Sequence, residues 1–106
     1  MKKFAFITRH AATPEQDALA NEQGITLIPV GDWDAFDQEG NFKKFKALLE
    51  EGFEGVVVVH PQLSLDAVAH MDVGIFKNSN RAPEGERPQF EAAAFHVTPW
   101  AGRWFV

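Results

Sequence analysis

The run Val56–Val59 constrains the fold of this chain more than any other feature. Its four consecutive β-branched residues place apolar side chains on both faces of an extended strand. Such a strand must be covered on both sides, as happens to the central strands of a parallel sheet that lies between helices. The run therefore predicts the middle strand of a parallel sheet under two layers of helix.

Further strand and helix patterns alternate on both sides of this run. They place strands at Lys3–Thr8, Ile25–Val30, Val73–Lys77 and Phe90–Val97, helices at Pro14–Gln23, at about 42–51 and at about Ser64–His70, and loops at Gly31–Gly40 and Asn78–Pro88. This alternation predicts an α/β fold in which residues 1–106 form a single Rossmann-like three-layer domain with right-handed crossovers. Pro29 favours an edge position for the second strand. Because no crossover helix fits before the fifth strand, we expect a mainly parallel sheet of about five strands with a C-terminal antiparallel strand.

A strong helix-start signal follows the first strand. Thr13 is placed as N-cap, Pro14 as the first helical residue and Gln16 as the residue that completes a capping box. Arg9 and His10 directly precede this start. Because the N-terminus of a helix presents free N–H groups and the positive end of its dipole, the pattern predicts a compact pocket for phosphate or another anion.

Polar residues follow three of the predicted strands, and the carboxyl ends of parallel strands share one edge of the sheet, where ligands bind at the point of reversed strand order. The candidate ligand-binding residues besides Arg9 and His10 are Thr8, Thr13, His60, Gln62, Ser64, Lys77, Asn78, Asn80 and Arg81. Each of these residues could instead have a purely structural role. Arg9 would pair with one of the fifteen acids, His60 would end a buried strand, and the asparagines would serve turn chemistry. His70 and His96 are interpreted as structural.

Charge and composition limit the classes of partner and cofactor that the chain can bind. A net charge of −5 argues against a long nucleic acid, because polymer binding rests on many Lys and Arg contacts to phosphate. The chain has no cysteine, which excludes disulfides, thiolate nucleophiles and Cys-based zinc sites and is compatible with the cytoplasm. The four histidines lack a paired metal-binding spacing, and the acids of the 31–40 loop lack the rest of a calcium loop, so we expect neither a metal nor a cofactor. No apolar run has transmembrane length, so we expect no membrane partner.

The segment from Thr8-Arg9-His10 to the Thr-Pro-Glu-Gln helix start resembles small stand-alone CRISPR-associated proteins related to CARF domains. The resemblance extends to Val56–Pro61 and, loosely, to Ala82–Arg87. It implies a homodimer that binds cyclic tetra-adenylate across its two-fold axis and, as in the ring nucleases of this group, cleaves the ligand without a metal. Independently of this resemblance, the last residues are too aromatic for a solvated tail, so we expect Trp100, Trp104 and Phe105 to pack on the domain or on a partner subunit.

The same opening segment also resembles the Arg-His-Gly motif of the histidine phosphatases, with Ala11 in place of the glycine. Thr13 matches a frequent threonine of that motif, and Val57–Pro61 is similar to the strand that carries the second histidine. This resemblance implies a phosphorylated His10. The short segment between the two histidines departs from that family, which supplies another arginine and an acid there.

The available residues are chemically suited to the first of these functions. A cyclic oligoadenylate carries its own 2′-hydroxyl nucleophile, so the protein need only align it, stabilise the phosphate charge and move a proton. Arg9 would clamp the phosphate and His10 would act as acid or base, with Asn78, Asn80 and Arg81 gripping bases or riboses. A non-catalytic nucleotide-binding or interaction module would use the same pocket.

Overall fold

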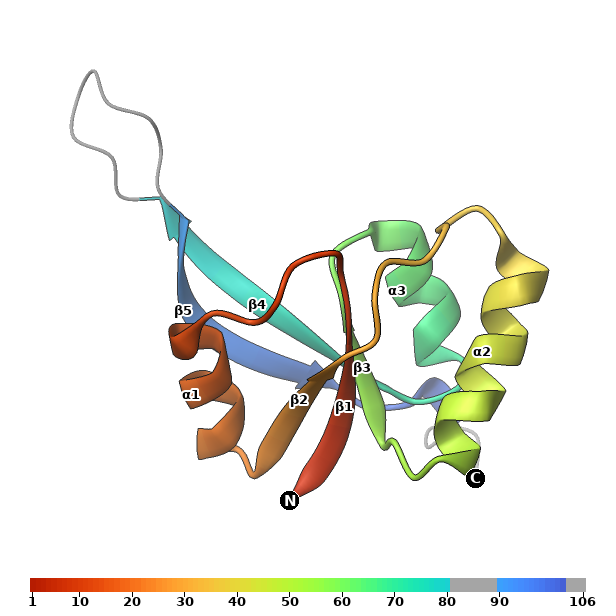
Figure 1. Cartoon of the computed structure of the whole chain (residues 1–106), viewed down its shortest axis with the longest axis horizontal. Coiled ribbons are helices and arrows are strands. Elements are labelled where there is room, and N and C mark those ends of the chain that lie inside the picture. The colour runs from red at the N-terminus through yellow and green to blue at the C-terminus, as the bar shows by residue number, and fades with distance from the viewer. Residues whose placement is uncertain (81–89, 103–106) are drawn as a thin grey trace.

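The computed structural model describes the backbone of residues 1–80 and 90–102 and the side chains of residues 1–77 and 94–102. Along the chain, strands and helices alternate as the sequence pattern predicts (Figure 1). The elements are β1 (Lys2–Ile7), α1 (Pro14–Glu22), β2 (Ile25–Pro29), α2 (Gln38–Glu50), β3 (Gly55–Val58), α3 (Pro61–Val68), β4 (Asp72–Asn80) and β5 (Phe90–Thr98).

In the described part of the chain, the strands form one sheet in the order β2-β1-β3-β4-β5. The β1–β2, β1–β3 and β3–β4 pairs are parallel, whereas β4 and β5 pair antiparallel. The predicted α/β class, the parallel sheet and the antiparallel last strand are therefore confirmed. β3 is the middle strand and is buried along its whole length, and β2, which ends at Pro29, lies at an edge.

Helices cover both faces of the sheet (Figure 1). On one face, α1 packs over β1, β2 and β5, where Phe4, Phe6 and Phe95 are buried around Ala20. On the opposite face, α2 and α3 cover β1 and β3, and Phe45 of α2 is the largest fully buried side chain of that layer. Successive side chains of β1 point to opposite faces of the sheet, so alternate residues pack into the two layers.

Two helices begin earlier than the sequence pattern predicts. α2 starts at Gln38 and not near 42, because the carboxylate of Asp37 accepts the N–H of Gly40 at 3.2 Å and caps the helix inside the predicted loop. α3 starts at Pro61 and not near 64, because the Nδ1 of His60 accepts the N–H of Gln62 at 3.2 Å. An imidazole that accepts through Nδ1 thus takes the place of the usual Asp or Ser cap.

β4 is longer than predicted and ends at Asn80, so Asn78 and Asn80 lie in a strand and not in a loop. Pairing with β3 stops at Gly74, and the rest of β4 pairs only with β5. β4 and β5 therefore extend beyond the end of β3 as a two-stranded ribbon (Figure 1). Residues 81–89, which include Arg81 and the Ala82–Arg87 segment of the resemblance, lie outside the described residues.

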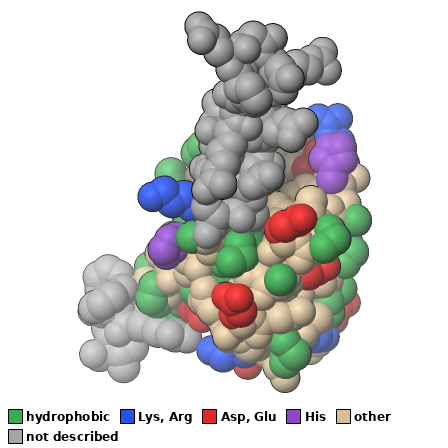
Figure 2. Space-filling view, turned by 90° about the vertical axis from the view of Figure 1, so that its left-hand side faces the viewer, with side chains coloured by type: hydrophobic (Ala, Val, Ile, Leu, Met, Phe, Trp, Pro, Cys, Tyr) green, Lys and Arg blue, Asp and Glu red, His purple; other side chains and the backbone are tan. Residues whose placement is uncertain are grey.

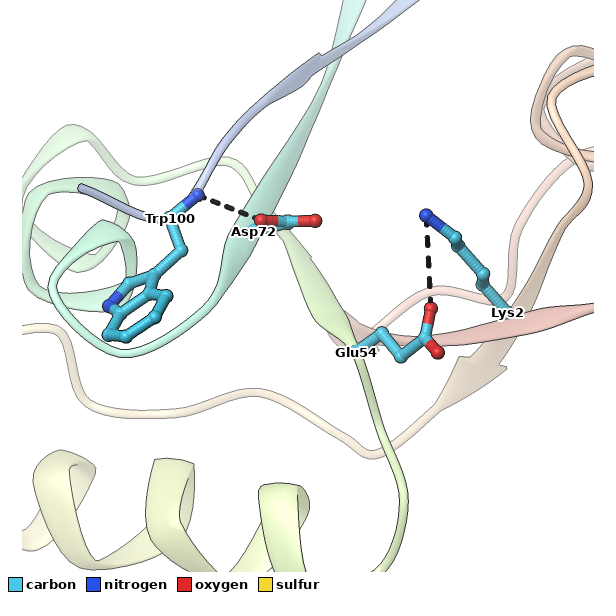
Figure 3. A network of polar contacts seen from close by, with 4 residues as sticks. All are labelled: Lys2, Glu54, Asp72 and Trp100. Carbon is cyan, nitrogen blue, oxygen red and sulfur yellow. Dashed lines mark hydrogen bonds and ion pairs between the residues drawn. The ribbon is translucent and has the colours of Figure 1, made fainter. Parts of the chain in front are cut away.

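After β5, the chain returns to the beginning of β4. The backbone N–H of Trp100 donates to the carboxylate of Asp72 at 2.8 Å (Figure 3), and its indole N–H donates to the carbonyl of Ala69 at 3.0 Å. Trp100 thus packs on the domain, although 40% of it is exposed. The predicted packing of Trp104 and Phe105 concerns residues outside the described part. Among the described residues, we find no helix with the length and apolar character needed to cross a membrane.

Candidate functional site

The order of the strands reverses between β1 and β3. The chain leaves β1 through α1 to reach β2 on one side, and it returns through α2 to β3 on the other side. Because α1 and α2 lie on opposite faces of the sheet, the ends of β1 and β3 open into a crevice that neither helix fills. The Thr8–His10 segment and the Val59–His60 segment follow these two strands directly.

A cavity of about 420 Å³, which we call the Arg9 cavity, lies at this crevice on the α2 side. Arg9, His10 and His60 line it together, so the predicted placement of Arg9 and His60 at one edge of the sheet is confirmed. Its walls are the Thr8–His10 segment, the loop Asp32–Phe36 and the beginning of α3. These three chain segments are far apart in sequence, and the parallel sheet brings them together.

A second cavity of about 440 Å³, the α1 cavity, lies on the other face of the same edge. Thr8 and His10 line both cavities, whereas Thr13 and Gln16 line only this one. The left-hand side of Figure 1, which Figure 2 turns toward the viewer, carries acidic side chains (red) among hydrophobic ones (green). Because Thr8 and His10 line both cavities, the Thr8–His10 segment is a wall that the Arg9 cavity and the α1 cavity share.

Thr8 fixes the backbone of His10 from both sides. Its hydroxyl oxygen accepts the N–H of His10 at 3.0 Å, and the same hydroxyl donates to the carbonyl of His10 at 2.8 Å. Arg9 lies between them and is exposed. Within the described part of the chain, an ion pair joins Lys2 to Glu54 at 4.0 Å (Figure 3), whereas Arg9 forms no ion pair with a described acid, although Asp32 and Asp34 line the same cavity.

The beginning of α1 offers fewer free amides than the sequence pattern predicts. The capping box forms as expected, with the N–H of Gln16 donating to Thr13 Oγ1 at 3.2 Å and the N–H of Thr13 donating to Gln16 Oε1 at 2.9 Å. The N–H of Asp17 donates to the carbonyl of Thr13, and Pro14 has no N–H. Because these groups are used and the first turn carries Glu15 and Asp17, an anion at this edge must be held mainly by side chains.

His60 has a structural role that also defines its chemistry. Its Nδ1 accepts the N–H of Gln62, which places the hydrogen of a neutral ring on Nε2. The ring packs edge-to-face with the exposed ring of Phe36, with centroids 5.4 Å apart and planes at 79°. His60 is thus held as a hydrogen-bond donor at the wall of the Arg9 cavity, in addition to ending a buried strand.

Two predicted ligand residues of α3 do not line the Arg9 cavity. The side-chain amide of Gln62 donates to the carboxylate of the buried Asp66 at 3.3 Å, and the amide of Gln38 joins the same carboxylate at 3.1 Å. Asp66 therefore links α3 to the beginning of α2, and the side chain of Gln62 is engaged with it inside α3. Ser64 lines a separate apolar groove between α3, β4 and the end of β5.

The predicted β4 group is only partly described. Lys77 is exposed and lines none of the three hollows described here. Asn78 and Asn80 belong to the extended part of β4, and their side chains, like all of Arg81, lie outside the described residues. The structure thus brings Thr8, Arg9, His10, Thr13 and His60 to one edge, and it separates Gln62, Ser64 and Lys77 from that group.

The Asp32–Phe36 loop is the part of the site that sequence reasoning missed. It was expected only as an acidic connection, yet Trp33 and Phe36 line the Arg9 cavity. β2 is the neighbour of β1 and runs parallel to it, so the segment after β2 reaches the same edge. The signal was the alternation of aspartates with aromatic residues directly after a strand. Among the described residues, no group of three or more His, Asp or Glu side chains is placed to hold a metal ion.

Comparison of the chain with models of protein families, with curated proteins and with solved structures gave no match. The two resemblances described above therefore rest on the opening motif and the strand–helix layout.

Proposed function

We propose that the protein binds cyclic tetra-adenylate at the Arg9 cavity and cleaves it without a metal ion. The observation that carries this proposal is the convergence of Arg9, His10 and His60 on one cavity at the strand-order reversal. Arg9 has no ion-pair partner among the described residues, and its guanidinium matches two phosphate oxygens with its fork of donors. The exposed ring of Phe36 at the wall of the same cavity suits a planar base of this ligand.

The proposed reaction is an internal transesterification. The 2′-oxygen of one ribose attacks the adjacent phosphorus, the new P–O2′ bond forms and the P–O5′ bond breaks. The products are a 2′,3′-cyclic phosphate and a free 5′-hydroxyl. One proton leaves the 2′-hydroxyl and one reaches the departing 5′-oxygen, so no water, cofactor or redox partner is consumed.

Three residues of the cavity, Arg9, His10 and His60, have a defined part in this reaction. Arg9 stabilises the negative charge that develops on the phosphate, and His10 transfers a proton. His60 donates from Nε2 to a phosphate oxygen, since its Nδ1 is occupied by the cap of α3. The backbone of His10 is held by Thr8, which limits the positions that the imidazole can take.

Two other functions use the same cavity. Because His10 and His60 both line it, a phosphotransfer through a phosphorylated His10, as in the histidine phosphatases, is the alternative reaction. A module that binds a nucleotide without turnover is the non-enzymatic alternative. We propose the cytoplasm as the location of all three, because a chain without cysteine needs no oxidising compartment.

Incubation of the purified chain with cyclic tetra-adenylate is expected to yield linear products that end in a 2′,3′-cyclic phosphate, at the same rate with and without EDTA. Chromatography and mass spectrometry identify the products. Loss of cleavage in EDTA contradicts the metal-independent reaction. Hydrolysis of p-nitrophenyl phosphate with an acid-labile phosphohistidine supports the phosphatase, and binding without products supports the module.

A symmetric homodimer is part of the proposal. The ring ligand has two-fold symmetry, which two identical sites about a two-fold axis would match. Val59 lines both the Arg9 cavity and the apolar groove beside α3. In this groove the side chains of Val59, Leu65 and Ile75 are 79%, 67% and 44% exposed. A second copy of this chain would cover these side chains beside the ligand.

Light scattering at micromolar concentration is expected to give twice the chain mass of 11.8 kDa. Leu65→Glu should convert the dimer to a monomer, because the introduced charge would be buried without a partner. Ala47→Glu places the same charge on the exposed face of α2 and should leave the dimer intact. A wild-type mass of one chain would refute the dimer and weaken the case for a cyclic ligand.

A further inference from the structure

Phe36 is a large apolar side chain that the fold leaves in solvent. It is 81% exposed, the highest value among the large hydrophobic side chains in the described part of the chain. It lies at the wall of the Arg9 cavity, and its neighbour Ala35 is buried in the core. An exposed aromatic ring at the mouth of a cavity differs in this respect from apolar residues scattered singly over a surface.

The loop that carries Phe36 is held in place by hydrogen bonds at its base. The carboxylate of Asp34 accepts the N–H of Phe36 at 3.0 Å, and the carbonyl of Asp34 accepts the N–H of Asp37 at 3.1 Å. The fully buried Asn41 of α2 donates its side-chain amide to the same carbonyl at 2.7 Å. The backbone is therefore fixed in a turn that presents the ring outward.

The other aromatic residue of the loop shows the contrast. Trp33 is partly buried, its ring centroid lies 5.2 Å from that of Phe45, and the Lys44 ammonium lies 5.1 Å from the indole centroid. Trp33 is thus committed to the core. Phe36 contacts His60 almost at a right angle, and its high exposure leaves most of its surface open.

The open ring and the guanidinium lie on the same cavity. Aromatic side chains stack on nucleobases with little dependence on sequence, and arginine binds phosphate as a fork. A nucleotide presents this pair of groups, a planar base and an anionic phosphate, on one small molecule. We propose that Phe36 is the stacking platform for a nucleobase whose nucleotide is anchored through its phosphate by Arg9. This inference rests on the proposed function for its site, but it requires binding only.

Titration of ¹⁵N-labelled protein with three probes tests the platform. The probes are adenosine 5′-monophosphate, ribose 5-phosphate and cyclic tetra-adenylate. The wild type is expected to bind the monophosphate more tightly than ribose 5-phosphate, which lacks the base. Phe36→Ala should weaken binding of adenosine 5′-monophosphate by about five- to a hundred-fold and leave ribose 5-phosphate unchanged, since only the base stacks.

Two further variants control the result. Phe36→Trp keeps an aromatic face and should retain the affinity for the base. Leu49→Ala removes an apolar side chain that is 44% exposed on α2 and should change neither probe. Because Phe36 is exposed, its replacement should leave the thermal midpoint nearly unchanged, and a melting curve checks this.

The outcomes separate this inference from the proposed function. If Phe36→Ala binds and cleaves cyclic tetra-adenylate like the wild type, the platform is refuted and the proposed function stands. If the wild type ignores cyclic tetra-adenylate but binds adenosine 5′-monophosphate in a manner that depends on Phe36, the platform stands and the proposed function fails. Equal affinity of the wild type for the two monophosphates, or binding of no probe, overturns the platform.

Discussion

His10→Ala is expected to slow the cleavage of cyclic tetra-adenylate by about a hundred- to ten-thousand-fold while its Kd stays near that of the wild type. This is the range over which a positioned proton-transfer group contributes to a rate. The variant is well matched, because Thr8 holds residue 10 through the backbone N–H and carbonyl only. Alanine keeps both groups, so the segment keeps its shape and loses only the imidazole.

Arg9→Ala is expected to weaken binding and to slow turnover together. The guanidinium interacts with the phosphate in the bound ligand and more strongly as charge develops, an effect on the order of several kcal/mol for such electrostatic contacts. Arg9→Lys keeps the charge without the fork of donors and should restore only part of the loss.

Binding titrations and single-turnover rates, each measured with and without EDTA, distinguish the two variants. If His10→Ala cleaves at the wild-type rate, His10 is not the proton-transfer group. If Arg9→Ala has unchanged affinity and rate, Arg9 does not clamp the phosphate, and the Arg9 cavity is not supported as the ligand-binding site.

The layout of the fold could be predicted because its signals are local. The valine run at 56–59 predicts the central strand, and Val56–Val58 lie in β3, whereas Val59 follows it and is 79% exposed. The sequence between β4 and β5 has no helix pattern, which predicts the antiparallel pair that they form. The capping box at Thr13 is also a local pattern, and it forms with both of its hydrogen bonds. The common edge of Arg9 and His60 then follows from the parallel direction of β1 and β3.

Other features depend on contacts that no local pattern contains. His60 caps α3 through a ring nitrogen, a role that its residue type does not announce. The aromatic wall of the Arg9 cavity reaches the site because β2 lies beside β1, which is a property of strand order. Gly55 is needed because a Cβ there would lie 2.6 Å from the ring of Phe4 and 2.7 Å from the carbonyl of Asp72. That requirement exists only after β1, β3 and β4 have paired.

Phe45→Ala is expected to lower the free energy of unfolding by about 3–5 kcal/mol, the usual loss when a buried phenylalanine is cut to alanine. Phe45 is fully buried in the layer under α2, and its ring lies 5.5 Å from the ring of His70, nearly parallel to it. Because a domain of this kind has a total stability of about 5–15 kcal/mol, the variant should unfold at a much lower urea concentration.

The same substitution should also reach the site, because Trp33 at the wall of the Arg9 cavity packs against Phe45 with ring centroids 5.2 Å apart. We therefore expect weaker ligand binding in the folded Phe45→Ala protein, with a smaller loss of stability and of affinity in Phe45→Leu. Leu49→Ala on the same helix removes a partly exposed side chain and should cost far less. Equal urea midpoints for Phe45→Ala and Leu49→Ala would show that α2 is not held through Phe45, and the support of the aromatic wall by the core would fall with that result.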